Sequence, residues 1–136
     1  MRVCLDTNVL VAAFATRGLC ADVLRAVLAD HDLVIGDVIL AELRRTLAKK
    51  FGLPADRIEA VEDVLSSFPS IPRPSEPADV DLRDPDDRWI LATAIAGEAT
   101  VLVTGDRDLL DARQRAPIPI LDPREFWEFL RENPSL

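Results

Sequence analysis

The first fourteen residues, MRVCLDTNVLVAAF (1–14), decide the fold because one acid joins a buried strand to a helix. Residues 3–5 are apolar on both faces, which is typical of a central parallel strand. The apolar residues of VLVAAF then recur at helical spacing, and Thr7 or Asn8 can cap that helix. Asp6 is therefore either a second capping residue or a side chain at the carboxyl end of a central strand, where open α/β sheets bind ligands.

The alternation of strand and helix continues along the rest of the chain. Further strands are expected near residues 33–35, 71, 100–104 and 118–121, and further helices over residues 21–29, 38–51, 54–67, 86–96 and 123–130. Asp37 is expected to cap the helix that Gly52 ends, and Asp122 to cap the last helix in a capping box with Glu125. This order predicts a parallel sheet with helices on both faces.

A proline-rich segment, residues 69–85, interrupts the pattern and resembles a domain linker. The roughly 50 residues after it are too few for a separate core and resume the same alternation. We therefore expect a single domain over residues 1–136.

The composition restricts the classes of protein to which the chain can belong. A net charge of −8 argues against a nucleic-acid binder held by bulk electrostatics, unless acids converge on a divalent cation that attracts phosphate. No apolar run reaches the length of a membrane span and no export signal is visible, so a cytoplasmic protein is expected. Cys4 and Cys20 are interpreted as small apolar residues, and with His31 they remain one ligand short of a structural zinc site.

Several catalytic motifs are missing from the sequence. It has no Gly-x-Gly-x-x-Gly, no phosphate-loop Gly-Lys pair and no Gly-x-Ser-x-Gly turn, and one histidine excludes a two-histidine ribonuclease. The remaining candidates for catalytic groups are carboxylates at particular positions.

Two of these acids lie on predicted helices. Glu42 projects near the edge of an apolar stripe, so it either points at a cleft rim or pairs with Arg45 one turn away. With Asp84 as N-cap, Asp87 takes the third helical position and faces inward, or is simply an anion favoured by the helix N-terminus.

Asp106 follows an apolar strand, just as Asp6 does, although strand-end acids often only cap turns. If the two strands are neighbours, both acids meet at the carboxyl edge of the sheet, and Glu42 and Asp87 reach it from flanking helices. Four unpaired carboxylates there would repel unless a cation held them, and oxygen-only ligands favour magnesium or manganese.

Four segments in this order resemble the acidic motifs of the PIN domain family, in its prokaryotic toxin branch of VapC-like toxins. They are CLDTNVLVAAF (4–14), ILAELRRTL (39–47), DPDDRWILATAIAG (84–97) and VLVTGDRDLL (101–110). The resemblance covers essentially the whole chain apart from the proline-rich segment. It implies a three-layer α/β/α fold with a five-stranded parallel sheet, and Asp6, Glu42, Asp87 and Asp106 as the acidic set. Asn8 and Thr104 match polar positions beside that set.

The function implied by the resemblance is a magnesium- or manganese-dependent ribonuclease, the toxin of a type II toxin–antitoxin pair. RNA, a cognate antitoxin and a second copy of the chain are the expected partners. Arg17, Arg45 and Lys49 are candidate RNA contacts, or else solvated surface charges. Two alternatives are a catalytically silent partner-binding module and an aspartate-based phosphatase. The phosphatase is disfavoured because Asn8 replaces its second aspartate.

Overall fold

The computed structural model describes residues 1–134, and its centre is a five-stranded parallel sheet. The strand order is β3-β2-β1-β4-β5, and every neighbouring pair is parallel. The strands are β1 (Arg2–Leu5), β2 (Asp32–Gly36), β3 (Ser70–Ile71), β4 (Val101–Val103) and β5 (Ile120–Leu121). The predicted α/β fold is confirmed, and its central strand β1 is the first one in the chain.

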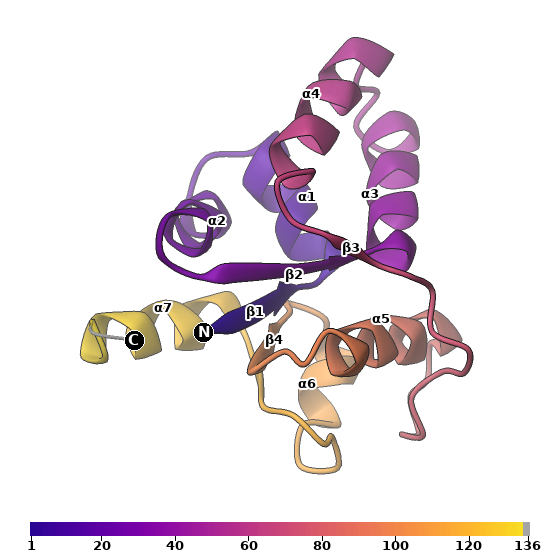
Figure 1. Cartoon of the computed structure of the whole chain (residues 1–136), viewed down its shortest axis with the longest axis vertical. Coiled ribbons are helices and arrows are strands. Elements are labelled where there is room, and N and C mark those ends of the chain that lie inside the picture. Colours follow the sequence, from indigo (N-terminus) through magenta and orange to yellow (C-terminus); the bar gives the residue numbers. More distant parts are fainter. Residues whose placement is uncertain (135–136) are drawn as a thin grey trace.

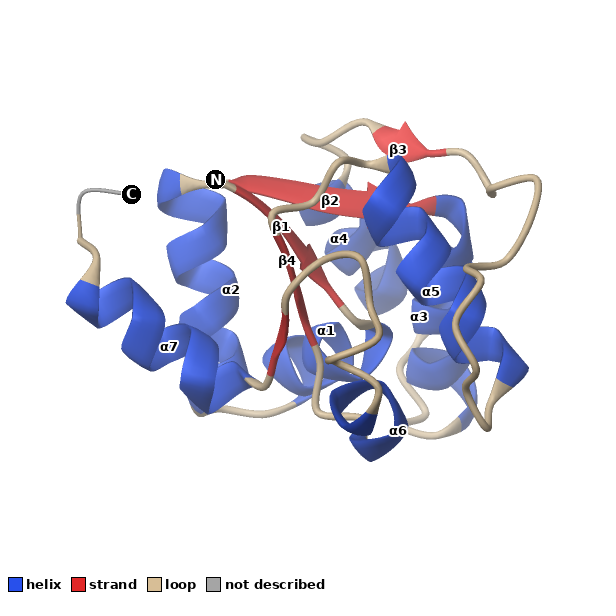
Figure 2. Cartoon of the chain, turned by 90° about the horizontal axis from the view of Figure 1, so that it is seen from below, coloured by secondary structure: helices blue, strands red, loops and turns tan. Residues whose placement is uncertain are grey.

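The helices cover both faces of this sheet. They are α1 (Thr7–Ala15), α2 (Leu19–Asp30), α3 (Asp37–Lys49), α4 (Ala55–Leu65), α5 (Pro85–Ala96), α6 (Arg107–Asp111) and α7 (Pro123–Glu132). The chain first proceeds outward from β1 to β3 and then crosses back to β4 and β5, so right-handed crossovers place α1 to α4 opposite α5 and α6, while α7 packs against α2. Figure 1 shows α1 to α4 on one side and α5 and α6 on the other, and Figure 2 gives the view from below.

Two helix caps can be compared with expectation. Asp6 caps α1, which is one of the two roles considered for it, because its carboxylate accepts the Thr7 N–H; the cap expected at Thr7 or Asn8 is not present. Gly36, not Asp37, occupies the cap position of α3. Asp37 is the first helical residue, and its Oδ1 accepts a hydrogen bond of 2.5 Å from Ser70 Oγ, which ties α3 to the edge strand β3.

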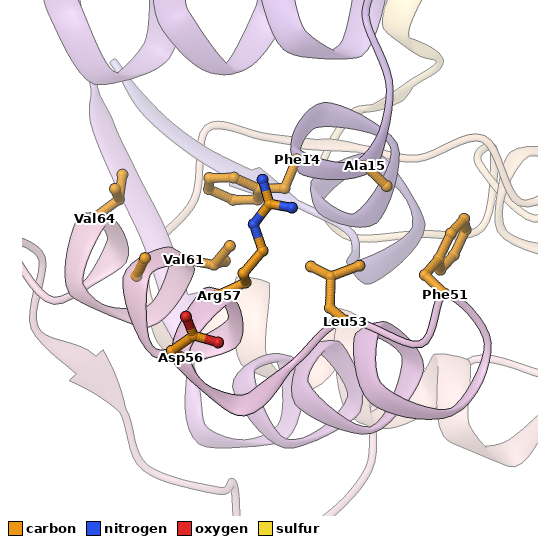
Figure 3. A pocket seen from close by; sticks show the side chains of 9 residues that line it. Phe14, Ala15, Phe51, Leu53, Asp56, Arg57, Val61 and Val64 are labelled. Carbon is orange, nitrogen blue, oxygen red and sulfur yellow. The ribbon is translucent and has the colours of Figure 1, made fainter.

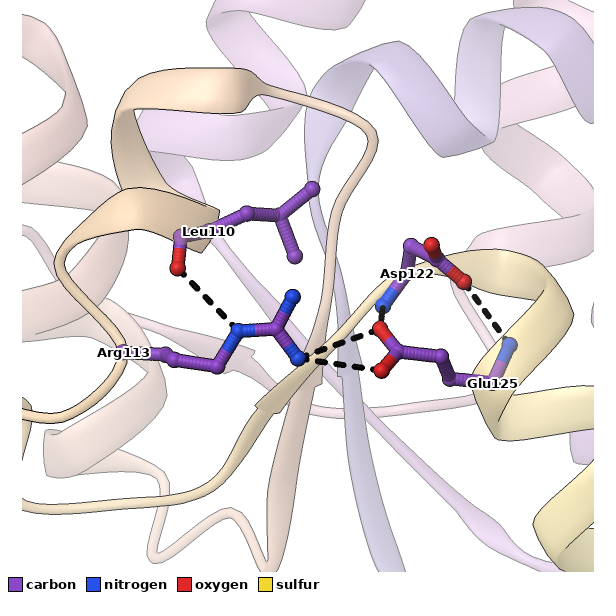
Figure 4. Close-up of polar contacts among 4 residues, drawn as sticks. All are labelled: Leu110, Arg113, Asp122 and Glu125. Carbon is purple, nitrogen blue, oxygen red and sulfur yellow. Dashed lines mark hydrogen bonds and ion pairs between the residues drawn. The ribbon is translucent and has the colours of Figure 1, made fainter.

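The segment GDRDLL (105–110) was expected to be a tight turn, and it contains the short helix α6. After β5, the predicted capping box at α7 is confirmed. Arg113 connects the two regions, because its Nη1 lies 3.0 Å from Glu125 Oε2 while its Nε donates to the Leu110 carbonyl (Figure 4). This contact fixes α6 against the start of α7.

The proline-rich segment is packed along α5. Its residues Ala78, Val80 and Leu82 are buried in the core. The backbones of Ala78 and Arg88 are joined by an N–H···O bond of 3.0 Å, and Arg88 Nε donates back to the Ala78 carbonyl. The expected edge strand near Ile71 is present as β3. No helix among residues 1–134 is long and apolar enough to cross a membrane.

Close packing between α5 and β2 depends on two glycines. A Cβ added at Gly36 would lie 2.4 Å from Thr93 Cγ2, and one at Gly97 would lie 2.4 Å from Val34 Cγ1. Both distances are far below van der Waals contact, so glycine lets the helix approach the sheet. Because α5 carries Asp87, this approach also sets the depth of that acid in the fold.

We predict that Gly36→Ala destabilises the protein by about 1–3 kcal/mol, because the methyl group must displace the buried Thr93 side chain. The melting temperature should fall by roughly 3–12 °C. Gly105→Ala is the matched control, since nothing lies within 4 Å of its Cβ position and its φ is not left-handed. Equal melting temperatures for the two variants would contradict the packing argument.

Candidate functional site

The carboxyl ends of β1 and β4 lie side by side at the centre of the sheet. Leu5 is paired with Val103, and the Asp6 N–H donates to the Val103 carbonyl at 2.9 Å. The residues that follow the two strands, Asp6 and Thr104, therefore face each other. The sequence-based expectation that Asp6 and Asp106 follow neighbouring strands is correct.

Asp6 is a buried carboxylate held at both oxygens. Its Oδ1 accepts the Thr7 N–H at 2.7 Å, and its Oδ2 accepts the Thr104 hydroxyl at 2.6 Å. The Thr104 Oγ1 in turn accepts the Asp106 N–H at 3.0 Å. Thr104 thus joins the two strand-end acids, which gives a physical basis for the polar residue expected there.

Burial raises the pKa of Asp6 to about 6. The hydrogen bonds from Thr104 and Thr7 oppose this rise, because they favour the charged form. The negative charges of Glu42 and Asp106 add to the rise. Asp6 is therefore electrostatically linked to Glu42 and Asp106, and its own charge raises the pKa of Asp87.

Asp87 lies at the third position of α5 after the Asp84 cap, as expected, and its side chain is buried. Its Oδ2 has no hydrogen-bond partner among the described residues. Burial, followed by a hydrogen bond with Asp106 and the charges of Asp106 and Asp6, raises the pKa of Asp87 to about 8. Such a group keeps its proton near neutral pH unless a cation replaces it.

Glu42 reaches the same edge from α3 and is half-buried. Burial raises its pKa, whereas the Thr7 hydroxyl and the Arg45 charge lower it. The alternative of an ion pair with Arg45 is not supported, since no ion pair within residues 1–134 includes any of the four predicted acids. Arg45 is exposed but near enough to influence the carboxylate.

One further acid, Asp108, supports the site and was not identified from the sequence. The Asp108 N–H donates to Asp106 Oδ1 at 3.0 Å, and Asp108 Oδ2 accepts the Asp84 N–H at 3.2 Å. The start of α6 is thereby tied to the start of α5, which brings Asp106 toward Asp87. The spacing of one residue between acids in DPD (84–86) and DRD (106–108) was the signal available.

The other residues predicted for the site, Asn8, Arg17 and Lys49, lie at the protein surface. Asn8 is exposed, on the first turn of α1, and lines a pocket that also contains Glu42. Arg17 and Lys49 are exposed, and Lys49 does not line that pocket. Lys50, one residue further along, does line it.

The donor set is oxygen-rich, and its charge and chemistry fit a hard divalent cation. Within residues 1–134, however, no three His, Cys, Asp or Glu side chains are arranged to hold a metal ion. Asp6 accepts a hydrogen bond from the Thr104 hydroxyl, whereas Asp87 Oδ2 has no hydrogen-bond partner among the described residues. Asp87 therefore has a buried oxygen that a cation could use.

A wider pocket of about 670 Å³ lies between the C-terminal end of α1 and α4, and its lining is mainly apolar side chains together with Asp56 and Arg57. Figure 3 shows Phe14, Leu53 and Val61 around it, with Arg57 reaching into it from α4. Phe51 and Val64 at its border are 44% and 45% exposed.

The fold is therefore a doubly wound α/β sheet, and its candidate site is a group of acids at the carboxyl edge that form no ion pairs among the described residues. A family model described as PIN domain matches residues 2–108, so the chain belongs to the PIN domain family. A chain in the crystal structure of VapBC2 from Rickettsia felis, bound to a DNA fragment from their promoter, has the same fold. It is 19% identical, with a TM-score of 0.58 over 90% of this chain and 98% of that chain. No curated protein matched the chain.

We predict that the metal-free protein loses stability as pH rises. Because the folded state raises the pKa of Asp6 to about 6 and of Asp87 to about 8, it binds more protons than the unfolded chain. The resulting stabilisation is complete below the unfolded pKa near 3.8 and is lost as pH rises through 6 and 8. Asp6 alone should account for about 1.4 kcal/mol between roughly pH 5 and pH 8.

The measurement is urea unfolding in EDTA across this pH range, with Asp87→Asn as a comparison. That variant should flatten the dependence, because it removes the group with the higher pKa. Wild-type stability that rises across the range would show that the acids are not buried together.

Proposed function

We propose that the chain is a metal-dependent endoribonuclease that hydrolyses phosphodiester bonds with magnesium or manganese. The observation that carries this proposal is the meeting of Asp6, Glu42, Asp87 and Asp106 at one sheet edge without an ion pair among the described residues. Burying these acids costs stability, so the arrangement favours a role that needs negative charge there. Membership of the PIN domain family supports the same reading.

Asp6, Asp87 and Asp106 would hold the cation, with Glu42 as a further ligand or a base that orients water. When bound, the cation would lower the pKa of a water molecule and offset the charge that develops on the phosphate. The role of the other residues is to position the acids that would hold the cation. Thr104 fixes the orientation of Asp6, and Asp108 holds the loop that presents Asp106.

Water rather than the ribose 2′-hydroxyl would be the nucleophile. The chain has one histidine, so it lacks the histidine pair that would activate the 2′-hydroxyl and protonate the leaving group. Hydrolysis of this kind should leave a 5′-phosphate and a 3′-hydroxyl.

We further propose that the chain acts in the cytoplasm as the toxin of a toxin–antitoxin pair. The VapBC2 structure, with the same fold, is described as bound to a fragment of promoter DNA. The apolar pocket bordered by Phe14 and Val64 is a surface that an antitoxin segment could cover. A second copy of the chain is another candidate partner.

A catalytically silent partner-binding module is the second candidate function. It is favoured by the lack of a three-carboxylate metal group among residues 1–134 and by the same apolar pocket. The two candidates differ in their response to metal.

We predict that the purified chain cleaves RNA with manganese and not with EDTA, and that Asp6→Asn lowers the rate at least about 100-fold. Manganese at a hundredfold excess over Kd should stabilise wild type by about 2.7 kcal/mol, or roughly 5–15 °C, and the variant much less. Asp79→Asn is a matched control, because Asp79 is exposed on the proline-rich segment. The assays are product analysis and melting curves.

Two outcomes would count against the nuclease. Cleavage that persists in EDTA, or products with a 2′,3′-cyclic phosphate, would exclude the metal mechanism. A wild type that neither cleaves RNA nor responds to manganese would favour the silent module.

We predict that reversing the charges of Arg45 and Lys49 weakens RNA binding and reduces its salt dependence, because single-stranded RNA releases counterions at each phosphate contact. The slope of log K against log salt should fall by about 0.7 per lost contact. Manganese affinity, measured by melting, should not fall, because reversing Arg45 adds negative charge near Glu42. Equal salt slopes for variant and wild type would assign both residues to solvated surface charge.

A further inference from the structure

A second pocket adjoins the acidic site on the side of α3. It lies between α1 and α3 and has a volume of about 280 Å³. Thr7 and Glu42, which lie beside Asp6, form its inner end, and Phe51 lies at its border. Its volume is near the lower limit for small-molecule pockets, which is about 300 Å³. It is therefore sized for one small group rather than for a protein segment.

Polar groups line this pocket next to the acidic site. Thr7 is 2% exposed, and its hydroxyl faces Glu42 closely enough to lower the pKa of that carboxyl group. Asn8 and Thr46 add an amide and a second hydroxyl to the lining.

An exposed aromatic ring borders the same pocket. Phe51 is 44% exposed and follows Lys50, the residue that ends α3. A flat apolar ring beside polar groups and one cation matches a nucleotide, whose base stacks on aromatic faces while its phosphate attracts a cation. Phe51 also lines the wider pocket along α4, but Thr7 and Glu42, beside the acidic site, line only this one.

We propose that this pocket binds the base and ribose of a nucleotide flanking the scissile phosphate. Phe51 stacks on the base, Asn8 or Thr46 bonds to the sugar or base edge, and Lys50 contacts the adjoining phosphate. The proposal rests on the proposed ribonuclease function. It identifies a binding site for one nucleotide of the substrate, which the positions of the acids alone do not identify.

The test uses short single-stranded RNA and the Asp6→Asn background with manganese, so that binding is measured without cleavage. Phe51→Ala should weaken binding roughly 5- to 100-fold, the range expected for one lost base stack. Phe51→Trp should restore it. Val64→Ala is the matched control, because Val64 is equally exposed but lines only the other pocket.

Salt dependence separates stacking from charge. Phe51→Ala should leave the salt slope unchanged, whereas Lys50→Gln should reduce it by about 0.7. In the catalytically intact chain, Phe51→Ala should raise KM more than it lowers kcat, because a stack made in both ground and transition states is uniform binding.

The outcomes distinguish the two proposals. If wild type cleaves RNA with manganese but Phe51→Ala binds it as tightly as wild type, the base pocket is wrong and the nuclease stands. If Phe51→Ala weakens capture of a partner protein and leaves RNA binding intact, the pocket belongs to a protein interface and the proposal is overturned. A wild type that neither binds nor cleaves RNA overturns both.

Discussion

The Thr104 hydroxyl, between the ends of β1 and β4, is the contact on which the site depends. It donates to Asp6 and accepts the N–H of Asp106, so one small side chain orients two acids. The contact exists only because β1 and β4 are neighbours, with Leu5 opposite Val103. Each hydrogen bond to Asp6 favours its charged form, and this partly offsets the cost of burying that charge.

Buried acidic side chains that lie close together lower the folding stability of this protein. Asp6 and Asp87 both have raised pKa values, and the charge of Asp6 contributes to the rise at Asp87. A fold selected for stability alone would not keep such a cluster, because replacing a buried charge without a partner usually stabilises. The cluster is tolerated because the strands and helices that carry it are well packed, with Leu5, Ile90 and Val103 almost fully buried.

The net charge of the chain limits the ways in which it could bind RNA. A net charge of −8 repels phosphate at long range, so binding cannot depend on a broadly basic surface. A cation at the sheet edge and a few basic groups close to it, such as Arg45 and Lys50, would act over short distances. Stacking on Phe51 does not depend on charge, so it would contribute to nucleic-acid binding even in an acidic protein.

Local patterns were enough to predict the strand and helix alternation, the caps at Asp84 and Asp122, and the acids at the ends of β1 and β4. Hydrophobic period, cap chemistry and strand ends are properties of a few consecutive residues, so the sequence alone determined them. Tertiary structure decided that Thr104 bonds to Asp6 across 98 residues, that Asp108 reaches Asp84, and that Lys50 rather than Lys49 lines the pocket with Glu42. Those contacts depend on which strands pair and how closely helices approach the sheet, and no short stretch of sequence encodes such distances.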